Sequence, residues 1–177
     1  MNNLSKLVSI ALLAMTAKVT AIELTSMDIT EGHHMKSAFE FSGWGCKGEN
    51  VSPQLTWTKV PGGTKSLAIT VYDPDAPTES GFWHWLVTDI PVTVHAIARG
   101  VDIEKLGAMQ HRNDYGNMNF GGACPPEADG MHRYQFTIWA LPDANLGLDP
   151  NTPAAVIGYQ LNAKAIAKKT LTATYTR

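Results

Sequence analysis

The sequence predicts a β-rich α+β domain, built as a sandwich of two antiparallel sheets with peripheral helices. Short apolar runs alternate with turn residues along most of the chain, which favours strands over helices. The 177 residues are 44% hydrophobic and 17% charged, values typical of one globular domain. No repeat or linker divides the chain after its N-terminal segment, so we expect a single domain over residues 22–177.

The N-terminal segment, residues 1–21, has the pattern of a cleaved signal peptide. Lys6 precedes an apolar run over 7–17, and compact residues end the segment at Ala21. The run is shorter than the roughly 20 residues that a membrane span needs. We therefore expect cleavage near Ala21 and a periplasmic or secreted domain. The alternative is an uncleaved amphipathic or buried N-terminal helix.

The apolar runs predict the elements in chain order. Strands are expected over residues 24–29, 37–41, 54–57, 66–72, 82–90, 132–141 and 171–176. A helix is predicted from Thr152 as N-cap and Pro153 as first helical residue, with apolar residues at helical spacing as far as Ala165. A shorter helix is expected over 103–109.

Two cysteines, Cys46 and Cys124, follow the predicted signal peptide. In an exported protein two cysteines most often pair, so a disulfide is the favoured interpretation. Two separate buried thiols are the alternative.

Two of the predicted strands begin near a histidine. In the first strand, alternation puts on one face Phe82, His84, Leu86, Thr88 and Ile90. In the second strand, one face carries His132, Tyr134, Phe136, Ile138 and Ala140. Each histidine therefore shares a face with large apolar residues, at the edge of the core, where burial and a hydrogen-bond partner fix its tautomer.

Two loops precede these strands, "DPDAP" (73–77) and "GGACPP" (121–126). The prolines of the first loop hold Asp73 and Asp75 in extended or turn geometry. Gly121 and Gly122 permit close approach of the backbone, and their amides are candidates to face an anion.

These stretches together resemble the phosphatidylethanolamine-binding protein family, and in particular its bacterial branch of Raf kinase inhibitor-like proteins. The resemblance covers nearly all of residues 24–177 and rests on "CKGENVSPQLTW", "DPDAP", "FWHWLVTDIP", "NDYG", "GGACPP", "HRYQF" and "LTATYTR". One departure is Ala123, which stands where members of this branch commonly have a proline. Another is "EADG" (127–130), which brings Glu127 and Asp129 near the expected site and is expected to disfavour a dianion.

The resemblance implies a β-sandwich with a small pocket for a phosphate or similar anionic head group. Carried over by position, the ligand-binding residues are Asp73, Asp75, Pro77, Phe82, His84, Cys124, Pro125, His132 and Tyr134. In this view His84 and His132 donate to phosphate oxygens, and Asp73 holds a histidine tautomer or faces an ammonium group. Anion binding would then weaken between pH 5.5 and 8 as the histidines lose charge.

Other functions are less consistent with the sequence. The Asp and His residues of the site can in principle hold a metal or act as an acid–base pair, but no HExxH, paired CxxC or GxSxG motif is present. We therefore expect no catalytic residue, metal or cofactor. A net charge of −2 without basic clusters disfavours nucleic acid. The family resemblance also implies, as an alternative, an inhibitor of an extracytoplasmic peptidase or kinase-like partner, and members of this branch are often homodimers.

Overall fold

The computed structural model describes residues 21–177, so the predicted signal peptide lies outside the described residues except for Ala21. Three antiparallel sheets form the fold. The largest has the strand order β10 (Ala167–Tyr175), β9 (His132–Leu141), β5 (Ser66–Asp73), β6 (Phe82–Pro91) and β8 (Met109–Gln110). The second has the order β1 (Glu23–Thr25), β4 (Leu55–Thr58) and β7 (Ala96–Ile97), and the third pairs β2 (Ser42–Gly43) with β3 (Cys46–Lys47).

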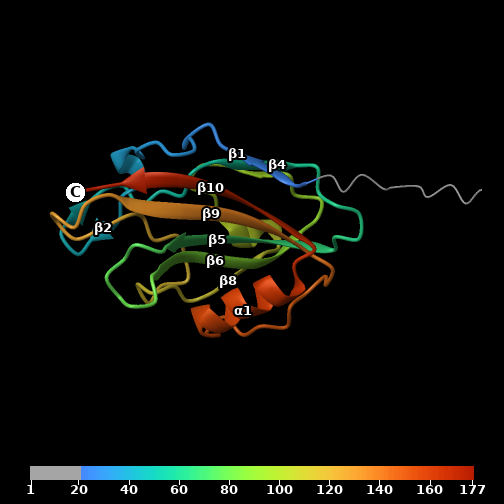
Figure 1. Cartoon of the computed structure of the whole chain (residues 1–177). Helices are drawn as coiled ribbons and strands as arrows, with labels where there is room; N and C mark the ends of the chain where they lie inside the picture. The colour runs from blue at the N-terminus through green and yellow to red at the C-terminus, as the bar shows by residue number, and fades with distance from the viewer. Residues whose placement is uncertain (1–20) are drawn as a thin grey trace, which may run out of the picture.

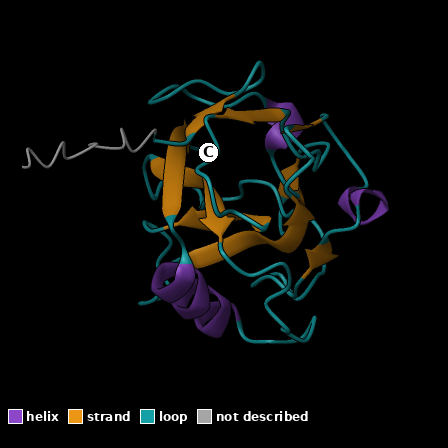
Figure 2. Ribbon diagram, turned by 90° about the vertical axis from the view of Figure 1, so that its right-hand side faces the viewer, coloured by secondary structure: helices purple, strands orange, loops and turns teal. Residues whose placement is uncertain are grey.

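Two hydrophobic layers lie on the two faces of the five-stranded sheet. The main core fills the space toward the three-stranded sheet and includes Leu67, Val71 and Trp57, all at most 1% exposed. On the other face, helix α1 (Ala154–Lys164) buries Ile157 and Leu161 against the sheet. Figure 1 shows β1 and β4 above the large sheet and α1 below it, and α1 again lies outside the strands in Figure 2. Strand β5 is buried on both faces, which explains its unbroken apolar run.

The predicted β-rich sandwich with a peripheral helix is confirmed, and β9 has the predicted bounds. Within residues 21–177 no helix is long and apolar enough to cross a membrane. Helix α1 begins one residue later than predicted, with Pro153 rather than Thr152 in the capping position.

The predicted strand over 37–41 is wrong. Residues Ser37–Phe39 form the 3-10 helix η1, which directs the fully buried Phe39 into the core. Backbone bonds from this segment go to Ala123 instead, because the Ala123 amide donates to the Phe39 carbonyl at 3.0 Å. The segment therefore holds the 121–126 loop in place rather than extending a sheet.

The helix predicted over 103–109 is shorter than expected and is not an α-helix. It is the 3-10 helix η2 (Ile103–Leu106), and Gly107 ends it in a left-handed conformation with φ 86°. The chain then turns into the short strand β8 at the edge of the large sheet.

The pairing of β5 with β6 contains two irregularities that break the predicted alternation. Val71 pairs with Trp85 and Tyr72 with Trp83, so His84 is the extra residue of a β-bulge. Beyond this bulge the faces exchange. Trp85 belongs to the main core, and Leu86 packs on the face that carries α1. The prediction that His84 shares its face with Leu86 is therefore wrong, because one inserted residue shifts the period of two.

Candidate ligand-binding site

A cavity of about 160 Å³ opens where β5 ends and where β6 and β9 begin. All of the predicted ligand-binding residues except Asp75 line it, namely Asp73, Pro77, Phe82, His84, Cys124, Pro125, His132 and Tyr134. The strands place these side chains together because, in an antiparallel sheet, the end of β5 lies beside the starts of its two neighbours.

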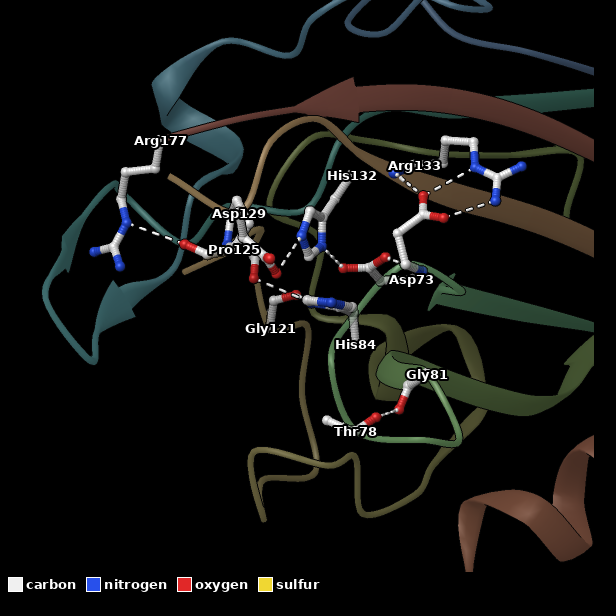
Figure 3. Close-up of polar contacts among 12 residues, drawn as sticks. Asp73, Thr78, Gly81, His84, Gly121, Pro125, Asp129, His132, Arg133 and Arg177 are labelled. Atoms are coloured by element: carbon white, nitrogen blue, oxygen red, sulfur yellow. Dashed lines mark hydrogen bonds and ion pairs between the residues drawn. The ribbon is translucent and has the colours of Figure 1, made fainter. Parts of the chain in front are cut away.

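His132 is held between two carboxylates (Figure 3). Its Nδ1 lies 2.7 Å from Asp73 Oδ2, and both side chains are only 3% exposed. Its Nε2 lies 3.2 Å from Asp129 Oδ2, and that carboxylate is 40% exposed at the rim. A carboxylate oxygen only accepts, so both bonds exist together only when both ring nitrogens carry hydrogen. Asp129 thus occupies the Nε2 side of His132.

Asp75 supports the first loop and does not line the cavity. Its two oxygens accept from the Arg133 guanidinium at 2.9 and 2.7 Å, and Oδ2 also accepts from the Arg133 amide at 2.9 Å. The bond with Arg133 lowers the pKa of the Asp75 carboxyl despite partial burial. The Asp75 amide in turn donates to Asp73 Oδ1 at 2.8 Å, which fixes the buried aspartate.

His84 has a different environment from His132. Its Nδ1 lies 3.0 Å from the Gly121 carbonyl oxygen and 3.1 Å from that of Gly122. Carbonyl oxygens cannot donate, so the ring hydrogen is on Nδ1 and Nε2 carries a lone pair. Burial lowers the pKa of His84 to about 4, although the charge of Asp73 acts in the opposite direction. At neutral pH His84 is therefore an acceptor, which does not agree with its expected role as a donor to phosphate.

Tyr134 lines the cavity and has a buried hydroxyl. The residue is 1% exposed, and its ring packs edge-on to His84 with centroids 5.1 Å apart. The hydroxyl lies near the Cys124 backbone, but that contact falls short of a hydrogen bond, so the oxygen has no partner among the described residues. Burial raises the pKa of Tyr134, so the group stays protonated and can donate.

The second loop is fixed by a disulfide and by backbone contacts. Cys46 and Cys124 are bonded, which joins β3 to the loop that lines the cavity. The Gly121 amide donates to the His84 carbonyl, and the Gly122 amide donates to Asn50 Oδ1 at 2.7 Å. Neither amide is therefore free to face an anion as the sequence suggested. A Cβ at Gly121 would lie 2.4 Å from the Tyr115 ring, so the close approach is to the protein itself.

The sequence reasoning missed five residues of the lining, which are Trp44, Ala76, Thr78, Tyr115 and Pro126. Tyr115 donates to the Gly122 carbonyl at 3.0 Å and packs against Phe82. Its position in "NDYG" was a usable signal. Trp44 is 66% exposed and lies between two glycines just before Cys46, so the disulfide brings it to the cavity.

The lining combines aromatic walls with few polar atoms. It contains no lysine or arginine among the described residues, and no group of three or more His, Cys, Asp or Glu side chains in residues 21–177 has the arrangement of a metal site. The site is suited to hold a small polar molecule whose hydrogen-bonding groups match those of the wall.

Comparisons with known proteins show the family to which the chain is similar. Residues 25–176 match the family described as phosphatidylethanolamine-binding protein. Protein YbcL of Escherichia coli K12 is 48% identical over 171 residues, covering 94% of this chain and 93% of that protein, and YbhB of the same organism is 36% identical, covering 87% and 99%.

Solved structures give the same result. The crystal structure of E. coli YbcL, described as a member of the mammalian PEBP family, superposes with a TM-score of 0.85 at 49% identity and covers 88% of this chain and 98% of that one. The crystal structure of a phosphatidylethanolamine-binding protein homolog from Chlamydia trachomatis superposes with a TM-score of 0.76 at 28% identity. The match covers 89% of this chain and 99% of that one.

Proposed function

Since the chain belongs to the phosphatidylethanolamine-binding protein family, we propose that it is an exported protein whose cavity binds a small ligand with a phosphate-type anionic head group. Export follows from the signal-peptide pattern in residues 1–21 and would place the domain in the periplasm or outside the cell. The ligand class is supported by the polar groups of the cavity together with the family to which the chain belongs.

The observation that carries the proposal is the unpartnered hydroxyl of Tyr134. A buried hydroxyl without a hydrogen bond costs free energy, and a ligand oxygen at this point would remove that cost. The cavity, at about 160 Å³, is smaller than the roughly 300–1,000 Å³ of pockets for drug-sized molecules. Its size therefore suits a head group rather than a whole lipid.

We propose binding rather than catalysis as the role of this cavity. Cys124 is in a disulfide and cannot act as a thiolate nucleophile. The Thr78 hydroxyl is engaged by the Gly81 carbonyl, and both nitrogens of His132 face carboxylates. Of the described histidines in the wall, only His84 has a free lone pair, and no hydroxyl or thiol is hydrogen-bonded to it, since the Tyr134 oxygen has no partner.

A thermal-shift panel on the purified protein tests the proposal. Inorganic phosphate, methyl phosphate and phosphoethanolamine would be compared with Zn²⁺ and Mg²⁺. A ligand present at 100 times its dissociation constant stabilises by about 2.7 kcal/mol. The Tyr134→Phe variant should lose most of the anion-dependent shift, and Tyr159→Phe, on the exposed surface of α1, should keep it. No shift with any anion would refute the proposal, and a shift with a metal alone would replace it.

An inhibitor of an extracytoplasmic protein is the second candidate function, and Trp44 favours it. This side chain is 66% exposed at the mouth of the cavity, as a protein contact would require. Wild type and Trp44→Ser would be assayed against a panel of purified peptidases. Inhibition that Trp44→Ser loses while it still binds methyl phosphate would support this role, and no inhibition by wild type would contradict it. Sedimentation equilibrium of the wild-type protein alone would show whether it forms a homodimer.

A further inference from the structure

Most polar atoms around the cavity are already used by the protein. Both oxygens of Asp73 accept hydrogen bonds, from His132 and from the Asp75 amide. Both nitrogens of His132 face carboxylates, and the Tyr115 hydroxyl donates to Gly122. What remains for a ligand on the buried side is Nε2 of His84 and the hydroxyl of Tyr134.

These two groups offer opposite hydrogen-bonding roles. His84 Nε2 accepts, because the two carbonyl oxygens at 3.0 and 3.1 Å hold the ring hydrogen on Nδ1. The Tyr134 hydroxyl stays protonated and can donate. The two groups do not satisfy each other, since the Tyr134 oxygen has no partner, and both residues are at most 3% exposed.

A fully deprotonated phosphate matches this pair poorly. It would direct an oxygen lone pair at the lone pair of His84, beside the buried Asp73 carboxylate, with no lysine or arginine in the lining to offset the charge. A ligand that carries one hydroxyl next to one acceptor oxygen matches both groups.

We propose that the cavity takes its ligand as the singly protonated phosphomonoester, whose P–OH donates to His84 Nε2 while a phosphoryl oxygen accepts from the Tyr134 hydroxyl. This inference rests on the proposed function and narrows it to one protonation state of one ligand class. The site would discriminate against sulfate esters, which have no proton to donate at neutral pH.

Several titratable groups surround the pair and have to be separated from the ligand's own titration. Asp73, His132 and Tyr115 face His84, and Asp73, Tyr115 and Tyr175 act on Tyr134. Asp129 contacts the far side of His132. Two ligands of equal charge experience these groups alike, so the ratio of their affinities reports only the ligand proton.

The test is calorimetric titration of the purified protein with methyl phosphate and with methyl sulfate from pH 5 to 8. Below its second pKa of about 6, methyl phosphate is a monoanion like methyl sulfate, but it carries one P–OH. We expect methyl phosphate to bind at least about tenfold more tightly at pH 5, since methyl sulfate leaves Nε2 without a donor. The ratio of affinities should then fall about tenfold per pH unit above about pH 6, as the monoanion disappears.

Each outcome decides between the inference and the proposed function. Equal binding of the two esters at pH 5, or a ratio that does not fall with pH, overturns the inference and leaves the proposed function intact. If the charge of the histidines were the cause, both esters would weaken together as the pH rises. Binding of neither ester at any pH overturns the proposed function and the inference with it.

A variant gives a second test of the same point. His84→Gln replaces the acceptor nitrogen by an amide that can also donate, so methyl sulfate should gain relative to methyl phosphate and the ratio at pH 5 should approach one. Tyr134→Phe removes a donor that both esters use and should weaken both to a similar degree. An unchanged ratio in a folded His84→Gln protein contradicts the inference, and the wild-type ratio decides the matter if that variant does not fold.

Discussion

The two histidines of the cavity lie close together, yet the protein gives them opposite environments. His132 has a carboxylate at each nitrogen, 2.7 Å from Asp73 and 3.2 Å from Asp129. His84 has only backbone carbonyls at Nδ1, and burial lowers its pKa to about 4. The first ring is suited to carry a hydrogen on both nitrogens, and the second is held neutral with one lone pair free.

Under the proposed function, the difference indicates how an anionic head group would be bound without a basic residue in the wall. Within the protein the Asp73 carboxylate accepts from His132 Nδ1, and the described cavity wall contains no lysine or arginine. Recognition then depends on matching donors with acceptors rather than on net charge. The expectation that both histidines donate to phosphate treated them as equivalent, and the structure separates their roles.

The largest effect is expected from breaking the buried pair on the His132 side. Asp73→Asn removes one partner of an ion pair that is 3% exposed on both sides and should cost about 3–5 kcal/mol of unfolding free energy. Asp75→Asn, two residues away, breaks a half-exposed pair with Arg133 and should cost about 1 kcal/mol or less. Urea denaturation measures both. An equal loss of unfolding free energy in the two variants would show that the buried pair stabilises the fold no more than the exposed one.

The next effect concerns the stability of the His84 side in acid. The unfolded ring takes up a proton near pH 6.5, and the folded ring does so only at about 4. The unfolded state therefore binds more protons in this window, and stability falls as the pH drops from about 6.5 to 4, with no further loss below it. The pKa difference corresponds to roughly 3 kcal/mol.

Urea titrations of wild type and His84→Gln at several pH values isolate this contribution, because the carboxylates that also titrate are common to both proteins. The stability of wild type relative to His84→Gln should fall by roughly 3 kcal/mol as the pH drops from 6.5 to 4. A constant difference would mean that His84 is not buried as a neutral ring.

The fold was largely predictable from local pattern, and each departure has an identifiable cause. The alternation in 132–141 gave β9 correctly because no residue interrupts it. The same reasoning failed after His84, since a one-residue bulge exchanges the two faces and leaves no mark in the apolar pattern. The segment 37–41 failed because the burial of Phe39 and the backbone bonds to Ala123 determine it, and both are long-range contacts.

Many residues of the cavity wall were predictable from the family resemblance, but the contacts they make were not. Family resemblance placed Asp73, His84, His132 and Tyr134 together, and all four line the cavity. The tautomer of His84 depends on two carbonyls that are 37 and 38 residues away in sequence, so no local pattern could show it. The family resemblance assigned Asp75 to the ligand, but its partner is Arg133 on β9, which is 58 residues away in sequence and could not be found from a local pattern.

The smallest effect is expected at the rim, where Asp129 meets His132. Asp129→Asn removes a negative charge that competes with an anion for Nε2, so methyl phosphate should bind roughly five- to tenfold more tightly. Glu127→Gln removes the same charge from the same exposed loop and serves as the matched control. Calorimetry at pH 5.5 measures both. Equal gains in the two variants would indicate a general charge effect, and no gain would show that Asp129 does not compete.

The central claim is that His84 presents a lone pair to the cavity, and nitrogen NMR tests it most directly. Long-range ¹H–¹⁵N spectra of the labelled protein distinguish the two ring nitrogens by their shifts and couplings, with His84→Gln to assign the signals. The account predicts that, from pH 7 to 5, His84 stays neutral with its hydrogen on Nδ1 and a bare Nε2, and that His132 carries a hydrogen on Nδ1. A hydrogen on Nε2 of His84 at neutral pH would contradict the account.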